Sequence, residues 1–256
     1  MFPIIQLGSL AIQTPGLIVL ATVWVALDIA AREGMRVGIA PEPIYNTGMI
    51  GIAGGLMGAR LWYVGAYWAL YRADLPAIVS LNSATLSPLG GVLLGLGLVI
   101  WYVRRRDLPV RRLLDVAAPA LVVFVAGLAL ANLAGGTDYG SPTRLPWAIY
   151  LWDDYRHPTQ VYHFLAALGI IAWLWRLKSS RNFDGLLFLE FVGLYALAGL
   201  LIEPLRADGV IWVGGVRAVQ VWSLAALLAA LWLWPRWAQG ETGPDPAPGD
   251  TANSLI

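Results

Sequence analysis

The sequence predicts an all-α, polytopic integral membrane protein with about seven transmembrane helices. Of its 256 residues, 58% are hydrophobic and 13% are charged, against roughly 45–50% and 25% in an average soluble domain. The mean hydropathy is +0.65, and 13 Trp and 10 Tyr supply the amphipathic aromatic side chains that are typical of membrane interfaces. A single water-soluble domain is therefore excluded, and the lipid bilayer is the first expected partner.

Seven apolar stretches approach the roughly 20 residues that a helix needs to cross a bilayer. We expect spans at residues 9–31, 47–71, 86–103, 114–134, 159–175, 185–204 and 218–235. Helices are favoured over a β-barrel because the stretches are continuously apolar and do not alternate with polar residues. Together they define a predicted seven-helix domain over residues 1–238, with its longest loop at residues 135–158.

The arginines and lysines of the connections predict the orientation, because they collect on the cytoplasmic side. Eleven of the 17 lie in the loops after the first, third and fifth stretches and in the C-terminal segment, while five lie in the other loops. We therefore expect the N-terminus outside, the C-terminus in the cytoplasm and the 135–158 loop outside. Residues 239–256, rich in Gly, Pro, Asp and Thr, are expected to form a disordered cytoplasmic tail.

Net charge and cysteine count narrow the function further. A formal net charge of +1 provides no basic field for nucleic acid, so no nucleic-acid partner is expected. The chain has no cysteine, which excludes disulfides, thiolate metal sites and a cysteine nucleophile. No Lys or Arg precedes the first apolar stretch, so we expect it to be retained and not cleaved as a signal peptide.

Ionisable side chains inside membrane spans are costly and are therefore candidates for function. Those that fall in the predicted spans are Asp28, Arg60, Asp115, Glu190 and Glu203. Asp28 and Asp115 lie near cytoplasmic helix ends, where capping or pairing with Arg32 or Arg112 explains them. Arg60 is interpreted either as a cation for a lipid phosphate or as the ion-pair partner of Glu190 or Glu203. Glu203 precedes Pro204 and Arg206, and its carboxylate is placed to orient an arginine that contacts a headgroup.

The two histidines lie close together in the sequence, His157 before a predicted helix start at Pro158 and His163 within that helix. Six residues separate them, which places them on opposite sides of a helix, so no metal site is expected. Arg156 and His157 fall just outside the helix, near the interface. Contact with a lipid headgroup and simple capping and packing are both open interpretations there.

Six sequence motifs give the chain a resemblance to the prolipoprotein diacylglyceryl transferase family. They are GARLWYV (58–64), the glycine pair 90–91, DVAAPAL (115–121), YGSPTRLPW (139–147), RHPTQVY (156–162) and LIEPLR (201–206). The resemblance extends from about residue 8 to residue 206, and the order and spacing of the motifs carry it.

The family resemblance implies a bacterial plasma-membrane enzyme. Such an enzyme moves the diacylglyceryl group of phosphatidylglycerol, or of another anionic phospholipid, onto the lipobox cysteine thiol of an exported preprolipoprotein, without a cofactor. The chemistry needs a base for the thiol and cations for the departing phosphate. The residues expected to bind the lipid are Arg60, Asn132, Arg144, Arg156 and Arg206, and those expected in catalysis are His157, His163 and Glu203.

The chain departs from the family pattern at polar positions. The histidine that the family has before the paired glycines is Leu89, and the arginine and glutamate of its fourth-span signature are Ala129 and Thr137, with Asp138 beside the latter. The arginine four residues before Glu203 is Gly199. The remaining departures are Pro15 for a tyrosine and His163 for a glutamate.

Two hypotheses follow from these departures. In the first, the chain is a divergent transferase in which His157 or His163 replaces the lost base while Arg156, Arg144 and Arg60 hold the phosphate. In the second, the fold and a lipid-binding cavity remain but catalysis is lost, and the chain serves as a membrane subunit or scaffold that binds other membrane subunits. The loss of polar groups at catalytic positions, beside intact framework motifs, favours the second.

Overall fold

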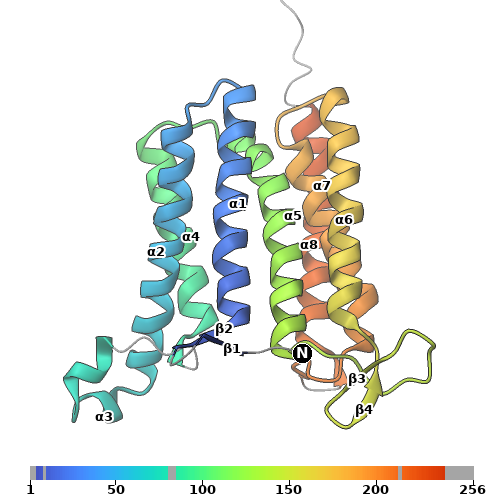
Figure 1. Cartoon of the computed structure of the whole chain (residues 1–256). Coiled ribbons are helices and arrows are strands. Elements are labelled where there is room, and N and C mark those ends of the chain that lie inside the picture. Colours follow the sequence, from blue (N-terminus) through green and yellow to red (C-terminus); the bar gives the residue numbers. More distant parts are fainter. Residues whose placement is uncertain (1–3, 8–9, 80–84, 213–214, 240–256) are drawn as a thin grey trace, which may run out of the picture. The chain divides into compact units, whose positions relative to one another are not determined.

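The computed structural model describes residues 4–7, 10–79, 85–212 and 215–239, most of which are helical (Figure 1). The helices are α1 (Thr14–Arg36), α2 (Pro41–Ala66), α3 (Trp68–Tyr71), α4 (Pro88–Arg105), α5 (Val110–Gly135), α6 (Thr159–Leu177), α7 (Leu186–Ile202) and α8 (Ala218–Gln239), with 3-10 turns at Leu75–Val79, Lys178–Ser180 and Glu203–Leu205. The strands are β1 (Ile4–Leu7), β2 (Leu10–Gln13), β3 (Ile149–Leu151) and β4 (Asp154–Arg156). Each of the seven predicted stretches overlaps a long helix, and the predicted helical membrane fold is confirmed.

Six described helices, α1, α4, α5, α6, α7 and α8, are long and apolar enough to cross a membrane, so the chain is a multi-pass membrane protein. Helix α2 has 26 residues and is also long enough, but its glycines and Arg60 make it less apolar. The predicted count of seven spans therefore depends on α2. The disordered tail was predicted for residues 239–256. Gln239 is the last residue of α8, and residues 240–256 lie outside the described part of the chain.

The predicted start of the first span, residue 9, was wrong. Residues 10–13 form strand β2, which pairs antiparallel with β1, and α1 begins only at Thr14. Pro15 explains the boundary, because proline lacks the N–H that a helix interior needs but is tolerated in the first turn. The predicted starts at Thr159 and Ala218 are confirmed.

The chain divides into two compact units, residues 27–116 and residues 1–26 with 117–256. The smaller unit is held together by helices α2 and α4, whose glycines face each other. A Cβ on Gly90 would meet the Gly58 carbonyl oxygen and the Trp62 side chain, and one on Gly91 would lie 3.0 Å from the Gly55 carbonyl oxygen. Small residues spaced in this way let two membrane helices approach closely.

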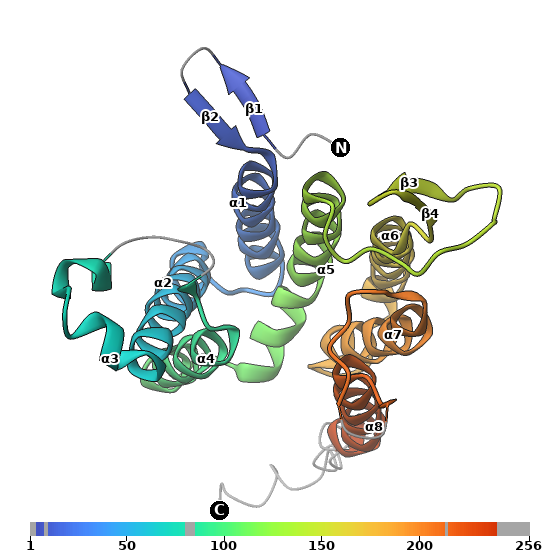
Figure 2. The same cartoon turned by 90° about the horizontal axis from the view of Figure 1, so that it is seen from below.

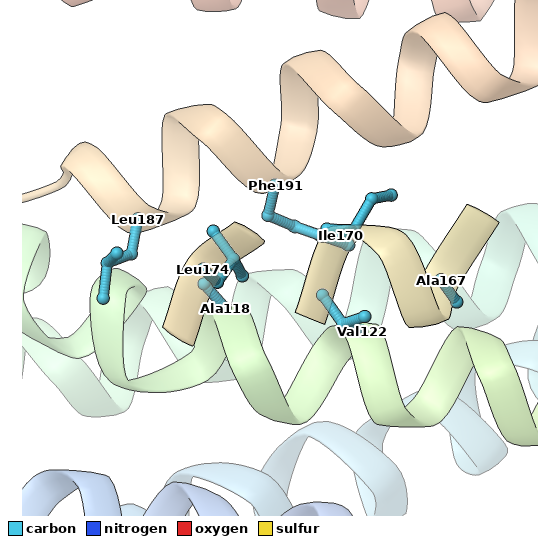
Figure 3. Close-up of a cluster of buried hydrophobic side chains, with 7 residues drawn as sticks. All are labelled: Ala118, Val122, Ala167, Ile170, Leu174, Leu187 and Phe191. Carbon is cyan, nitrogen blue, oxygen red and sulfur yellow. The ribbon is translucent and has the colours of Figure 1, made fainter. Parts of the chain in front are cut away.

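The larger unit contains a buried apolar cluster built by helices α5, α6 and α7. Figure 3 shows its seven side chains, which are Ala118, Val122, Ala167, Ile170, Leu174, Leu187 and Phe191. Seen along the helices, α5, α6, α7 and α8 follow one another in chain order, and the β3–β4 hairpin lies beside the start of α6 (Figure 2). The cluster joins the first half of α5, the second half of α6 and the first half of α7, and the candidate site lies at the opposite ends of these three helices.

Candidate active site at the ends of helices α5, α6 and α7

Three extended segments that are distant in sequence form the base of the site. Gly140 and Ser141 exchange backbone hydrogen bonds with His157, and on the other side Ser141 donates to Leu205 while Ala207 donates to Tyr139. Only glycine fits at position 140, because a Cβ there would meet the backbone and Cβ of His157. The motifs around residues 140, 157 and 205, which carried the family resemblance, therefore meet in space.

Asp138 is the centre of a polar cluster on this base. One carboxylate oxygen accepts a hydrogen bond from Nδ2 of Asn132 at 2.5 Å, and the other lies 2.5 Å from Nη2 of Arg206. Its backbone carbonyl accepts the hydroxyl of Thr159, and its φ of 55° is a left-handed value that aspartate tolerates better than most residues. Asp138 thus links the end of α5 with the start of α6 and the turn after α7.

Arg206 is surrounded by acidic side chains. Besides Asp138, its guanidinium contacts Asp208 at 2.9 Å and Glu203 at 3.3 Å. Partial burial lowers the pKa of Arg206, but the carboxylates of Asp138, Asp208 and Glu203 outweigh burial and raise the pKa above its usual value. The guanidinium is therefore fully protonated at physiological pH and directs its donors toward carboxylates.

Glu203 is almost completely buried, with 1% of its surface exposed. Its Oε2 pairs with Arg206, whereas Oε1 has no hydrogen-bond partner among the described residues. A carboxylate that is paired on one side only is costly to bury. The sequence analysis proposed that Glu203 orients an arginine, and the structure shows this contact with Arg206.

His163 lies on α6 within electrostatic range of both Asp138 and Arg206, and Tyr195 on α7 shares these two neighbours. Gln160, one turn earlier on α6 and 1% exposed, donates from Nε2 to the Thr137 carbonyl oxygen at 2.7 Å. One face of α6 therefore supplies several polar groups to the cluster. The structure brings together four predicted site residues, Asn132, His163, Glu203 and Arg206.

Arg156 and His157 form a second group on the same base. Arg156 donates from Nε to the Leu151 carbonyl oxygen at 3.0 Å, and its guanidinium lies over the ring of Tyr139 at 5.1 Å. Nδ1 of His157 lies 3.3 Å from the hydroxyl of Tyr162, which accepts the indole N–H of Trp147 at 2.8 Å. Helix α6 begins at Thr159, which confirms that both residues lie just outside it.

The remaining two predicted lipid-binding arginines are Arg144 and Arg60, which belong to other segments of the chain. Arg144 is exposed in the loop before β3. Arg60 belongs to the smaller unit and is 9% exposed; its guanidinium donates to the carbonyl oxygens of Ala77 and Ile78 at 2.5 and 2.8 Å and to Thr85. These contacts give Arg60 a structural role in holding the segment after α3, beside either role that the sequence analysis proposed.

Among the other charges in the predicted spans, Asp28 pairs with Arg32 at 2.8 Å, which confirms the structural interpretation. Glu190 accepts the indole N–H of Trp173 at 3.0 Å. Asp115 is 2% exposed.

Sequence reasoning missed Asp208 and Arg217. Both lie in the segment between α7 and α8, and their side chains come close to Glu203 and Arg206 because the chain turns back after α7. Neither residue belongs to a motif used in the sequence analysis. A useful signal was the charge density of residues 203–217, where Glu203, Arg206, Asp208 and Arg217 flank a predicted membrane span.

Three of the positions where the chain departs from the family pattern carry apolar residues, namely Leu89, Ala129 and Gly199. Ala129 is 5% exposed and Leu89 is 55% exposed. Gly199 faces α8, where a Cβ would lie 2.6 Å from Oγ of Ser223. The divergence itself remains a prediction.

Comparison with known proteins agrees with the motifs at this base. Three relatives are each named phosphatidylglycerol–prolipoprotein diacylglyceryl transferase and are 27% identical to the chain. They come from Synechococcus elongatus (90% of this chain, 86% of the relative), Thermosynechococcus vestitus (94% of each) and Clostridioides difficile (79% and 82%). The model of the prolipoprotein diacylglyceryl transferase family matches residues 3–236, and the chain belongs to this family.

Proposed function

We propose that the protein transfers the diacylglyceryl group of phosphatidylglycerol to the cysteine thiol of a prolipoprotein signal peptide, at the plasma membrane of a bacterium. The observation that carries the proposal is the family match over residues 3–236, with relatives of that name. The cluster of the buried Glu203 with the partly buried Asp138 and Arg206 supplies acid–base groups at the ends of membrane helices. Residues 135–158 would then face outward, where exported peptides arrive.

An apolar groove supports a lipid substrate. Helices α1, α5 and α6 line a groove of about 330 Å³ in the larger unit. Its lining includes Leu130, two residues before Asn132, and Phe164, which follows His163. An acyl chain in the groove would place its glycerol end near the polar cluster, and the groove has only apolar side chains and Thr22 to offer it.

We assign phosphate binding to Arg156 in preference to Arg206. Arg206 already contacts three carboxylates, which repel a phosphate, whereas Arg156 contacts two backbone carbonyl oxygens and an aromatic ring. A guanidinium held by neutral carbonyls keeps its full charge for an anion. His157 stands next to it, and in the tautomer whose Nδ1 accepts from the Tyr162 hydroxyl, Nε2–H would donate to the same phosphate.

The test is a transfer assay with purified protein, phosphatidylglycerol vesicles and a synthetic lipobox peptide, with the peptide mass as readout. A diacylglyceryl adduct above the protein-free control supports the proposal. No adduct, while an authentic relative is active in the same vesicles, contradicts it and leaves the lipid-binding membrane subunit as the function. Replacing phosphatidylglycerol with another anionic phospholipid measures the headgroup preference.

Arg156→Gln tests the phosphate assignment. We expect kcat/KM to fall by at least about tenfold, because a charge-assisted phosphate contact is lost at the departing group. Arg72→Gln is the matched control, since Arg72 is exposed in the loop after α3, and it should change kcat/KM by less than about twofold. Equal activities of the two variants would remove Arg156 from the site.

A further inference from the structure

A second groove, of about 420 Å³, lies between the neighbouring helices α6 and α7 (Figure 2). It shares no lining residue with the groove of α1, α5 and α6. Apart from Glu190 and Trp173, its lining consists of aliphatic residues and Gly169. A Cβ built on Gly169 would meet nothing within 4 Å, so the groove is open at this position. Its volume is in the range of sites that hold small molecules.

Glu190 places a carboxylate at one end of this apolar groove. Its Oε2 accepts the indole N–H of Trp173 at 3.0 Å. No lysine or arginine forms an ion pair with Glu190 in the described part of the chain, which holds all 17 of these residues. A charge on a membrane helix is costly and usually has a partner of opposite charge. A cation from outside the chain would supply this partner.

The tryptophans of α6 indicate the depth of Glu190 in the membrane. Trp173 and Trp175 lie near the end of α6 and are 47% and 65% exposed, as tryptophans at a membrane interface are. Glu190 is four residues from the start of α7, about 6 Å along its axis. The carboxylate therefore lies close to the lipid headgroups. From there the groove extends along α7 to Leu201, about 16 Å away along the axis.

Arg176 adds a positive charge at the headgroup end of the groove. It is exposed and follows Trp173 by three residues on α6, and residues three apart are neighbours on the surface of a helix. A carboxylate and a guanidinium thus occur together where the groove meets the headgroups. A lipid headgroup with one phosphate and one ammonium complements both charges. A single lysine or arginine of another membrane helix complements Glu190 but is repelled by Arg176.

We propose that the groove between α6 and α7 binds a zwitterionic aminophospholipid of the phosphatidylethanolamine type. Its ammonium donates hydrogen bonds to Glu190, its phosphate accepts from Arg176, and one acyl chain fills the groove toward Leu201. A primary ammonium has the N–H donors that a carboxylate needs, and choline has none. Phosphatidylglycerol has no ammonium, and Glu190 repels its negative charge. The site is therefore separate from the proposed substrate and does not rest on the transferase function.

Photocrosslinking tests the site directly. The full-length protein is placed in phosphatidylcholine vesicles with a trace of phosphatidylethanolamine that carries a photoreactive group on one acyl chain. After illumination, peptide mass spectrometry measures the lipid adducts on residues 166–173 and 194–201, with adducts on α8 as the internal reference. Replacing part of the phosphatidylcholine with unlabelled phosphatidylethanolamine should suppress the groove adducts, whereas the same fraction of phosphatidylglycerol should change them by less than about twofold.

Two variants act on different parts of the site. Glu190→Gln should lower the groove adducts about tenfold, because the hydrogen bonds of the ammonium to a charged acceptor are lost. Gly169→Leu fills the open part of the groove and should lower them without touching the headgroup contacts. The matched controls are Glu42→Gln, at an exposed carboxylate in the first turn of α2, and Gly97→Leu, where an added Cβ meets nothing within 4 Å. Both should keep the wild-type adducts.

Three results would overturn the proposal. The first is an equal yield of groove adducts in the wild type and Glu190→Gln, which would show that the carboxylate does not select the lipid. The second is equal competition by phosphatidylethanolamine and phosphatidylglycerol. The third is a membrane protein that co-purifies with the wild type, shields the groove from the probe and is lost in Glu190→Gln, because a basic helix of that protein would then be the partner of Glu190.

Discussion

Asp138 connects side chains from three segments, and its charge is the feature that holds Asn132 and Arg206 together. Asp138→Asn keeps the shape but removes the charge. We expect it to lower the free energy of unfolding by about 1–3 kcal/mol, because hydrogen bonds to charged groups are stronger than neutral ones and the remaining bonds weaken. Thermal unfolding of the purified protein in detergent measures the change.

The control for Asp138 is another aspartate in an ion pair. Asp28 pairs with Arg32, but the two side chains are 41% and 71% exposed, so Asp28→Asn should change stability by less than about 1 kcal/mol. If both variants lose equal stability, the cluster around Asp138 contributes no more than an exposed pair.

Whether the sequence identifies a site residue depends on where in the chain the residues that it contacts lie. Asn132, Glu203 and Arg206 lie in or beside motifs of ordered spacing, and the sequence analysis found them. Arg217 approaches Glu203 only because the segment after α7 folds back over Gly209, and no local pattern encodes a contact of this kind. The roles of the residues in the cluster around Asp138 could therefore be assigned only with the structure.

At the scale of elements, glycines govern the contact between α2 and α4. A Cβ on Gly58 would meet the Gly90 carbonyl oxygen and lie 2.5 Å from Cβ of Leu94, so Gly58→Ala forces the helices apart. We expect a loss of about 1–3 kcal/mol in unfolding free energy, as for other overpacked interiors. Unfolding in mixed micelles with increasing SDS measures it.

Gly97→Ala on α4 supplies the contrast. An added Cβ there meets nothing within 4 Å, and alanine favours the helix over glycine by about 1 kcal/mol. Gly97→Ala should therefore be neutral or stabilising. Equal losses in Gly58→Ala and Gly97→Ala would show that backbone flexibility, and not the close approach of helices, explains the glycines of this pair.

The β3–β4 hairpin has a turn that its sequence does not favour. Trp152 and Asp153 both have positive φ values, 52° and 59°, as the two central residues of a type I′ turn require. Asp153→Gly should raise the melting temperature or leave it unchanged, whereas Asp153→Val should lower stability by about 1–2 kcal/mol because a side chain in the left-handed region is strained. Equal melting temperatures of the two variants would contradict this account.

Helix positions were predictable and their ends were less so. Long apolar runs determine where a membrane helix lies, and every expected stretch overlaps one. The ends depend on local chemistry: Pro15 delays the first helix to Thr14, while Pro41 allows α2 to begin before the expected residue 47. The β1–β2 hairpin was missed because its apolar residues merge with the first hydrophobic stretch.

For the whole molecule, the distribution of arginines predicts the orientation, and the proposed function requires it, since the peptide arrives from outside. Helix α2 is decisive, because it alone among the seven long described helices falls short of the composition of a typical span. If α2 crosses the membrane, the loops before and after it lie on opposite sides. If α2 does not cross, these two loops lie on the same side and the number of membrane crossings becomes even.

Single introduced cysteines can decide this, because the chain has none of its own. We expect a membrane-impermeant maleimide added to intact cells to label Asp74→Cys and Leu145→Cys, both at exposed positions. Ala40→Cys and Ser180→Cys, also exposed, should react only after the cells are permeabilised. Labelling of positions 40 and 74 on the same side would show that α2 does not span the bilayer. Labelling of position 180 in intact cells would reverse the predicted orientation of α6 and α7, and would place the cluster around Asp138 on the side away from exported peptides.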